Sequence, residues 1–557
     1  MSATLLQPAS ETPETLASCA NCPALQRVER ELGALRREVS ELRCEVGYWR
    51  SRHADAVKRN QQLAEELRQA KGEIRTLRDE RFGRKSEKAT STDRSNDLFD
   101  PLESSIPSSK RGAQPGQDGH VRRDYSHLPE VEEFISLPME SLACPICGKP
   151  AAIISASEDS ELLEIDVRAY RRRIRRRRYR ATCDCDPARR TLVAPPPPKL
   201  IPKGNYGISI WVHVLLDKYS SYRPTERLLG QLEQYDLDLP AGTVNDGLQR
   251  IEPMLQPIYE ALCQRNRQGD FHQADETRWL VFLLFPGKKG YGWWLWVVLA
   301  ADTVIYRLAP SRGHEVPQAH FGPQASGILE VDRYSGYKAM TQVKSGLLLL
   351  AFCWAHVRRD FVRVGKGWPE LTPWAISWLR RIRCLYQVNR ERLRSAADSP
   401  EFQQQDALLR QTLDAMRVQA SNELSDRQLR QPCRKVLDSL EEHWTGLTRF
   451  VDDPRIPLDN NASERAGRGP AVARKNFYGS GSLWSGRLAA TMFSLFATLA
   501  HWKLNPRRWL TWYLESCAAA GGRAPEDIRP FLPWNLSAER HVELTVRAAA
   551  KAIADTS

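Results

Sequence analysis

"YGWWLWVVLAADTVIYRLAP" (residues 291–310) contains two of the five apolar segments that decide the fold of this 557-residue chain. The segments are rich in β-branched and aromatic residues and are bounded by Gly, Pro or polar turns, which is typical of strands. The other three are TRWLVFLL (277–284), GILEVD (327–332) and LLLLAFCWAHV (347–357). Three consecutive strands, a short helix near 314–321, and then alternating strands and helices predict a mixed sheet covered by helices.

Two aspartates stand at the ends of these expected strands. Asp275, in HQADETRW, comes just before the first strand with Glu276 beside it, and Asp332, in LEVDRYSGYKAM, ends the fourth. Catalytic groups of α/β folds gather at the carboxyl edge of the sheet. Two carboxylates brought together repel each other, and a divalent cation is the usual way to hold them there. A third acid would complete a site for two metal ions roughly 4 Å apart, which suits phosphodiester chemistry.

Glu464 is the candidate for this third acid. It lies in LDNNASERAGRGPAVARKNFYGSGS (458–482), which shows no apolar periodicity and is rich in Gly and Ser. Taken alone, the stretch could be a solvated loop whose charges neutralise one another. With the two aspartates, Glu464 is interpreted as a metal ligand and its basic neighbours as contacts to a phosphate backbone. These neighbours are Arg465, Arg468, Arg474 and Lys475.

The charge and apolar pattern favour a nucleic-acid partner. The net charge is +13, and RRRIRRRR at residues 171–178 concentrates part of it. No apolar run has membrane-spanning length and the N-terminus lacks a secretory pattern, so the expected location is the cytoplasm. Twelve cysteines in such a chain argue against a disulfide framework.

Four cysteines form two close pairs. Cys144 and Cys147 lie in CPIC, and Cys183 and Cys185 in CDC, which together predict a structural tetrahedral Zn²⁺ site. The arginine run lies between the pairs, so a zinc-pinned hairpin would present it to DNA phosphates. The arginines are Arg171, Arg172, Arg173, Arg175, Arg176, Arg177 and Arg178. Cys19 and Cys22 have no second pair nearby and are interpreted as free thiols.

A seven-residue repeat of apolar residues begins at Leu25. Its a and d positions are Leu25, Val28, Leu32, Leu35, Val39, Leu42, Val46 and Trp49. The repeat continues more weakly to Leu77 and predicts a coiled coil, with Asn60 at an a position favouring a parallel dimer. The alternative is one long amphipathic helix packed on its own chain.

Several motifs in this order resemble the large transposase of bacterial insertion sequences of the IS66 family. They are RFGRKSEK, GAQPGQDGH, the four-cysteine module, HQADET, VDRYSGY, CWAHVRRDF and DNNASERAGRGPAVARKNFYGS. The resemblance covers nearly the whole chain. It implies a DDE transposase with a ribonuclease-H-like domain, catalytic acids Asp275, Asp332 and Glu464, and two Mg²⁺ or Mn²⁺ ions. It also implies two small accessory proteins from the same element. The departures are Arg333, where Gly is expected, and Gly467 and Gly469.

The expected fold class is a multidomain α+β protein. In CWAHVRRDF, His356 is interpreted as a packing or orienting residue, and Arg358 and Arg359 as DNA contacts. The expected parts are a disordered N-terminus (1–24), a coiled coil (25–80), a linker (81–130), a zinc-binding β module (131–194), a helical region (199–268), a ribonuclease-H-like catalytic domain (269–364 and 451–517) with a helical insertion (365–450), and a C-terminal tail (518–557). The segment 225–251 fits either a DNA-reading helix-turn-helix, with Thr225 as N-cap, or an ordinary helical hairpin.

The expected function is a transposase that cuts the ends of its element by metal-assisted hydrolysis and joins the 3′-hydroxyls to target DNA. The alternative is a non-catalytic DNA-binding regulator derived from a transposase.

Overall fold

The computed structural model describes residues 23–82, 146, 149, 162–163, 167–180, 191–284, 290–397 and 399–545. The chain divides into two compact units. One contains helix α1 and residues 363–375, and the other contains the sheets and the remaining helices.

The central sheet of the larger unit has five strands and is mixed, as the sequence predicts. Its strands are β3 (Phe271–Leu280), β4 (Gly292–Leu299), β5 (Val304–Ala309), β6 (Gly327–Val331) and β7 (Leu348–Phe352). Their order is β5-β4-β3-β6-β7. The β3–β4 and β4–β5 pairs are antiparallel, whereas β3–β6 and β6–β7 are parallel. The fold is therefore α+β with a mixed sheet.

Strand β3 begins earlier than expected, so Asp275 lies inside it rather than before it. Its first residues, Phe271 to Gln273, pair with β6, and Asp275 stands opposite Val297 of β4. The polar residues at this end of the strand hid it from the apolar pattern. They are buried with hydrogen-bond partners: His272 Nε2 lies 2.6 Å from Asn266 O, and Gln273 Nε2 donates to Glu330 Oε2 at 2.7 Å. A buried polar group is tolerated when it is paired in this way.

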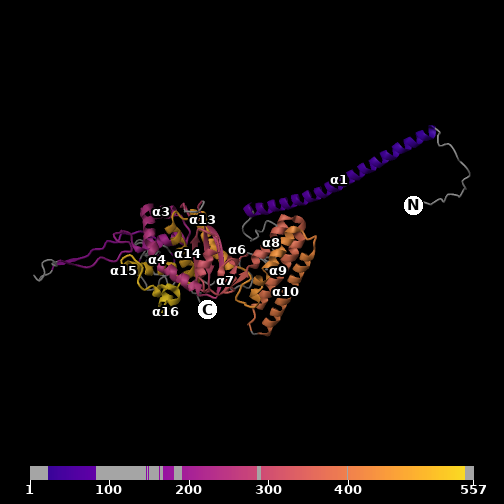
Figure 1. The fold of residues 1–557 in the computed structure, drawn as a ribbon. Coiled ribbons are helices and arrows are strands. Elements are labelled where there is room, and N and C mark those ends of the chain that lie inside the picture. The colour runs from indigo at the N-terminus through magenta and orange to yellow at the C-terminus, as the bar shows by residue number, and fades with distance from the viewer. Residues whose placement is uncertain are drawn as a thin grey trace. The chain divides into compact units, whose positions relative to one another are not determined.

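Helices that come before and after the sheet in the sequence pack on its strands or on one another (Figure 1). They are α2 (Ile208–Tyr219), α3 (Thr225–Glu233), α4 (Ala241–Arg267), α13 (Asn461–Phe477), α14 (Leu483–His501) and α15 (Pro506–Ala519). Helices α4 and α14 contact β5, and α13 contacts β3 and β4. Phe493 of α14 packs edge-on against Trp279 and Tyr306, with ring centroids 5.9 and 5.8 Å away. Such aromatic pairs add about 0.5–1.5 kcal/mol beyond the area they bury.

Thr225 begins α3 as its first residue, because Pro224 occupies the N-cap position. The Thr225 hydroxyl instead accepts a hydrogen bond from Lys218 Nζ at 2.9 Å. Helix α4 buries one face, including Ile251, Leu255 and Ile258, against the core of the domain. Helices α3 and α4 thus each contribute buried residues to the core.

Short helices join the strands. They are α5 (Glu315–Phe321), α6 (Ser335–Lys338) and α7 (Thr341–Lys344). Gly322 ends α5 with φ of 76°, a conformation that side chains with a Cβ rarely adopt.

Most of the described residues between β7 and the Glu464 segment are helical. The helices are α8 (Trp354–Gly367), α9 (Thr372–Arg392), α10 (Pro400–Ser425), α11 (Gln431–Glu442) and α12 (Trp444–Leu447). Helices α8, α9 and α10 run side by side (Figure 1). Hydrogen bonds attach the end of this region to the sheet: Trp354 Nε1 donates to Leu447 O, and Arg449 Nε donates to Leu350 O, both at 2.8 Å.

The segment after α15, expected as a tail, packs on the domain as far as residue 545. Phe531 lies 4.3 Å from the Trp512 ring centroid and accepts a backbone hydrogen bond from Trp509 Nε1 at 2.9 Å. Helix α16 (Ala538–Leu544) ends beside α15, where Asn505 N donates to Leu544 O at 2.6 Å. These contacts bury Phe531 and Leu544.

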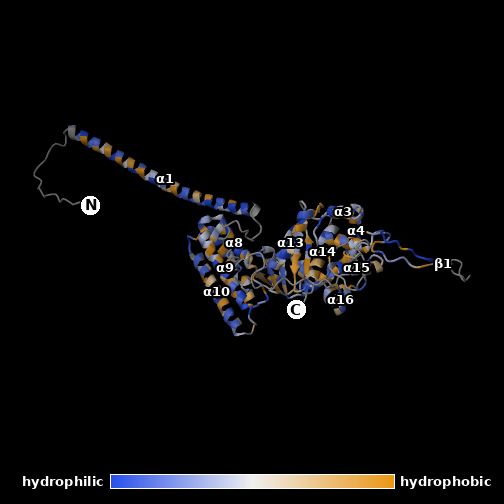
Figure 2. Ribbon diagram, turned by 180° about the vertical axis from the view of Figure 1, so that it is seen from behind, coloured by the Kyte–Doolittle hydropathy of each residue, from blue (hydrophilic) through white to orange (hydrophobic). Residues whose placement is uncertain are grey.

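Helix α1 (Pro23–Phe82) is one continuous helix of 60 residues, which at 1.5 Å per residue is about 90 Å long. The apolar side chains of the repeat are exposed, including Leu35 at 58% and Leu42 at 53%. Figure 2 shows these hydrophobic residues recurring along an otherwise hydrophilic helix. Helix α1 therefore has an apolar stripe that is exposed among the described residues.

A two-stranded ladder carries the end of the arginine run. Strand β1 (Arg178–Arg180) pairs with β2 (Thr191–Val193) in antiparallel register. Arg171 to Arg178 are exposed, and most of the run lies outside the strand. Cys144, Cys147, Cys183 and Cys185, with Cys19, Cys22 and the expected linker, lie outside the described residues.

Among the helices that the structure describes, none combines the length and the apolar character needed to cross a membrane.

Candidate functional site

Asp275 is a half-buried residue in the centre of β3. Its Oδ1 accepts a hydrogen bond from Glu276 N at 2.8 Å. Burial, together with the negative charges of Glu276, Asp332 and Glu464, raises the pKa of Asp275 to about 7 against the lowering effect of that hydrogen bond. Asp332 and Glu464 are thus close enough to Asp275 to act on it electrostatically.

Asp332 follows directly after β6, at the strand end predicted from the sequence. Its Oδ1 accepts a hydrogen bond from Tyr334 N at 2.9 Å, an arrangement in which an Asp side chain fixes its own turn. Because β6 is parallel to β3, the chain leaves β6 beside the middle of β3, where Asp275 lies.

Glu464 lies in the first turn of α13, so the stretch that could have been a loop is a helix. Asn460 anchors this turn to the sheet: its Nδ2 donates to Ala274 O at 2.7 Å and its backbone N to Cys353 Sγ at 3.2 Å. Glu464 Oε1 lies 3.8 Å from His356 Nε2 and 3.7 Å from Arg359 Nη2, both on α8. Residues of CWAHVRRDF therefore face the third acid.

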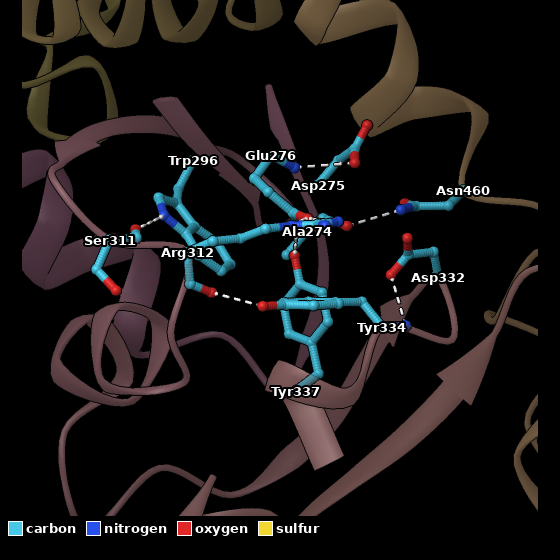
Figure 3. Close-up of polar contacts among 10 residues, drawn as sticks. All are labelled: Ala274, Asp275, Glu276, Trp296, Ser311, Arg312, Asp332, Tyr334, Tyr337 and Asn460. Atoms are coloured by element: carbon cyan, nitrogen blue, oxygen red, sulfur yellow. Dashed lines mark hydrogen bonds and ion pairs between the residues drawn. The ribbon is translucent and has the colours of Figure 1, made fainter. Parts of the chain in front are cut away.

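A buried network on the other face of β3 joins the two aspartate-bearing segments (Figure 3). Successive strand residues point to opposite faces, and Glu276 lies opposite Trp296 of β4. Glu276 Oε1 pairs with Arg312 Nη2 at 2.6 Å, and its Oε2 accepts from Tyr337 Oη at 2.7 Å. The Glu276 side chain is 1% exposed. Burial raises the pKa of Glu276, against the lowering effect of the hydrogen bonds from Tyr337 and Arg312.

The same network reaches the turn that holds Asp332. The Arg312 guanidinium stacks 3.9 Å from the centroid of the Tyr334 ring, and Tyr334 Oη donates to Arg312 O at 3.1 Å. Tyr334 N is also the donor to Asp332. A continuous series of contacts thus runs from Asp275 through Glu276, Arg312 and Tyr334 to Asp332.

Arg333, the departure from the expected Gly, has two partners. Its Nη1 donates to Ser439 Oγ of α11 at 2.9 Å, and its Nη2 pairs with Asp360 of α8. The arginine therefore ties the segment after Asp332 to the helical region between β7 and α13.

The two unexpected glycines differ in their surroundings. A Cβ at Gly469 would lie 2.1 Å from Tyr222 Oη, so the absence of a side chain there admits the tyrosine. A Cβ at Gly467 would meet nothing within 4 Å. Only Gly469 has a packing reason in the described structure.

The basic residues around Glu464 divide into two kinds. Arg465, Arg468 and Lys475 are exposed on α13. Arg474 instead binds the edge of β3, where its Nη1 donates to Arg278 O and to Thr277 Oγ1. The backbone of the following Gly/Ser segment is also engaged: Gly479 N donates to Phe477 O and Ser480 N to Leu280 O. Of the four basic residues, Arg465, Arg468 and Lys475 are therefore open to solvent.

The donor set fits divalent metal ions in its chemistry, because carboxylate oxygens are the ligands that such ions prefer and two of the three acids raise the pKa of the third. Asp275, Asp332 and Glu464 are the residues that could hold such ions. Within residues 23–82 and the other described ranges, no group of three or more His, Cys, Asp or Glu side chains is already arranged to hold a metal ion. Glu464 rests against Arg359 and His356 instead.

Sequence reasoning missed Arg312, Tyr337 and Asn460. Asn460 stands in the same motif as Glu464, so its place beside a proposed ligand could have indicated it. In the same way, the place of Glu276 directly after Asp275 could have indicated a polar network. Tyr337 likewise ends the VDRYSGY motif of Asp332, whereas Arg312 carried no such signal, because only the fold brings it to Glu276.

Comparisons with known proteins agree with these motifs. A sequence model described as "Transposase IS66 family" matches residues 203–488. Two uncharacterized proteins of Sinorhizobium fredii (strain NBRC 101917 / NGR234) are similar to the chain. Protein y4jD is 30% identical over 433 residues, which are 74% of this chain and 81% of the relative. Protein y4hP is 25% identical over 447 residues, which are 74% of this chain and 76% of the relative.

Proposed function

The chain belongs to the transposase IS66 family, and from this premise we propose that it is a DDE-type DNA transposase. It cleaves the ends of an insertion sequence and joins the freed 3′-hydroxyls to target DNA by two-metal phosphoryl transfer. The observation that carries the proposal is the placement of Asp275 in β3, Asp332 at the end of the adjacent parallel strand β6, and Glu464 in the first turn of α13, which contacts β3.

The sheet supports a ribonuclease-H-like catalytic domain. Its first three strands are antiparallel neighbours, and the next two add in parallel on the other side of β3. The proposed acids come from β3, the end of β6 and the helix α13, which contacts β3. Residues 365–450 form the proposed insertion between the fifth strand and this helix.

Each acid has a distinct role in the proposal. Mg²⁺ or Mn²⁺ ions bound at the site would activate the attacking oxygen and stabilise the leaving 3′ oxygen. Asp275 and Asp332 provide fixed ligands, because hydrogen bonds from Glu276 N and Tyr334 N orient them. Glu464 would become the third ligand by leaving its contacts with His356 and Arg359. Arg359 would then be positioned to neutralise the scissile phosphate.

Other parts of the chain serve DNA in this proposal. Cys144, Cys147, Cys183 and Cys185 hold a structural Zn²⁺, and the arginine run between them binds phosphates. Arg358, Arg465, Arg468 and Lys475 extend this surface. Helix α1 pairs with a second copy as a parallel coiled coil, which holds two element ends together, and two small accessory proteins complete the assembly in the cytoplasm.

The test is strand transfer by the full chain on duplexes carrying the inverted repeats that flank its reading frame, with Mg²⁺ or Mn²⁺. Asp275→Ala, Asp332→Ala and Glu464→Ala should each abolish cleavage and joining while DNA binding persists, and double variants should be no worse than single ones. Asp414→Ala removes an exposed acid of α10 and is the matched control. Strand transfer by Glu464→Ala would refute the assignment, and metal-independent DNA binding without cleavage by the wild type would favour a regulator.

A further inference from the structure

Helix α9 has one buried face and one face made largely of arginine. Trp378, Ile382 and Leu385 are fully buried. On the opposite side, Arg380 and Arg390 are exposed and Arg383 is half-buried. The spacings of three and seven residues place these three side chains on one face of the helix. We call them the α9 arginine face.

These arginines have no acidic partner within ion-pair distance among the residues that the structure describes. The neighbouring Glu391 pairs instead with Arg394 at 2.8 Å. The arginines of α10 differ: Arg410 pairs with Asp406 and Asp452, and Arg417 with Glu441. Helix α10 thus neutralises both of its arginines, whereas on α9 Arg392 pairs with Asp406 and the three residues of the arginine face stay uncompensated.

Contacts place α9 near the acid site. Phe361 of α8 stacks on Trp378 of α9, with ring centroids 5.3 Å apart and an interplanar angle of 15°. Arg359, on the same helix α8, lies 3.7 Å from Glu464. Helix α8 therefore contacts both the proposed third acid and the helix that carries the arginines.

Tyr386 gives a second indication of where α9 lies relative to the acid site. It lies three residues after Arg383 and four before Arg390, so it is their neighbour on the helix. Burial raises the pKa of Tyr386 well above its usual value, and the charge of Asp459, just before α13, raises it further. The edge of the arginine face is therefore close to the segment that leads into the Glu464 helix.

The spacing and chemistry of this face suit a nucleic-acid backbone. Arg380 and Arg390 are ten residues apart, which is about 15 Å along a helix, or roughly four base pairs of duplex DNA at 3.4 Å each. Guanidinium groups bind phosphate oxygens in bidentate geometry. Three uncompensated guanidinium groups in a row offer phosphate contacts but no base-specific ones.

We propose that the α9 arginine face binds the phosphate backbone of the duplex DNA that lies next to the site of cleavage. This inference rests on the proposed function and adds a substrate-binding role for the helical region between β7 and α13. The contacts hold the duplex without reading its sequence, so they serve element and target DNA alike.

The test compares three variants of the full chain for binding a labelled 30-base-pair duplex of arbitrary sequence, by fluorescence anisotropy over a series of salt concentrations. The first replaces the face (Arg380→Gln, Arg383→Gln and Arg390→Gln). The second keeps its charge with Lys at the same positions. The third is the matched control on α10 (Arg410→Gln and Arg417→Gln).

The Gln variant should bind at least about tenfold more weakly. The magnitude of its negative slope of log K against log salt should decrease by about 2 to 3, because each phosphate contact contributes about 0.9. The Lys variant should restore most of the slope, which a merely structural role of these residues would not predict. The α10 control should keep the wild-type slope. Wild-type affinity and slope in the Gln variant would overturn this inference alone, whereas a wild-type chain that binds no duplex would overturn the proposed function as well.

Discussion

At the scale of single residues, two consecutive acids have different surroundings because a strand alternates its faces. Asp275 turns toward Asp332 and Glu464, and Glu276 turns toward Arg312 and Tyr337. The first is proposed to hold metal ions, whereas the second already has a cation and a hydroxyl as partners. Glu276 is therefore a positioning residue that connects β3 to the turn of Asp332 through Arg312 and Tyr334.

Removal of Arg312 tests this network. Arg312→Met leaves the Glu276 carboxylate buried without its cation, and the free energy of unfolding should fall by about 2–4 kcal/mol, less than for a fully buried pair because Arg312 is partly solvated. Adding Glu276→Gln should recover part of the loss. Urea unfolding followed by tryptophan fluorescence measures both.

The control is Arg455→Met, which breaks a pair of Arg455, 61% exposed, with Asp270, 71% exposed. Its cost should stay below about 1 kcal/mol, as for surface pairs in general. Equal losses from Arg312→Met and Arg455→Met would contradict the proposed importance of the buried network.

At the scale of elements, α13 combines the proposed ligand with close packing. Glu464 lies in its first turn, and Gly469 lies beside Tyr222 one to two turns later. Asn476 Nδ2 also donates to Tyr222 O at 2.7 Å, so the helix contacts the segment after α2 at two points. The direction in which the Glu464 side chain points depends on this packing of α13.

Two glycines of α13 provide a matched pair of substitutions. Gly467→Ala should raise the free energy of unfolding by about 0.5–1 kcal/mol, because Ala is the better helix former and meets no neighbour. Gly469→Ala should lower it by about 1–3 kcal/mol, because its Cβ overlaps the Tyr222 side chain. Thermal unfolding of the two variants would contradict this account if Gly469→Ala were as stable as Gly467→Ala.

The apolar strands could be predicted from the sequence, and the polar start of β3 could not. Strands β4 and β5 are mainly apolar and pack in the core, so their composition alone indicates them. His272 and Gln273 are buried only because Asn266 and Glu330 supply partners from other elements. The same reason conceals Arg312, whose partner lies 36 residues away. The helix around Glu464 was also hidden, because its polar sequence depends on anchoring by Asn460 to β3 and Cys353.

At the scale of the whole molecule, the chain combines a net charge of +13 with an apolar stripe that is exposed along α1. Val39 and Val46 at a positions and Leu35 and Leu42 at d positions favour two parallel strands. A dimer would bring two proposed catalytic domains to two DNA ends. In the proposed function, the apolar stripe thus joins two chains and the positive charge binds the DNA ends that they hold.

Sedimentation of the full chain tests the dimer. The wild type should sediment as a dimer at about 10 μM, a range suited to coiled-coil association. Leu35→Glu with Leu42→Glu places charges in the stripe and should yield monomers, whereas Arg37→Glu, off the stripe, should leave the dimer intact. A monomeric wild type would return α1 to a helix packed within its own chain.

The most direct test of the central claim is Mn²⁺ binding, measured by electron paramagnetic resonance on the full chain bound to a duplex carrying the element's terminal repeat. The account predicts about two tightly bound ions in the wild type, as a two-metal site requires. It predicts loss of tight binding in Asp275→Asn, Asp332→Asn and Glu464→Gln, and wild-type binding in Asp414→Asn. Unchanged binding in all three acid variants would contradict the claim that these residues form one metal site.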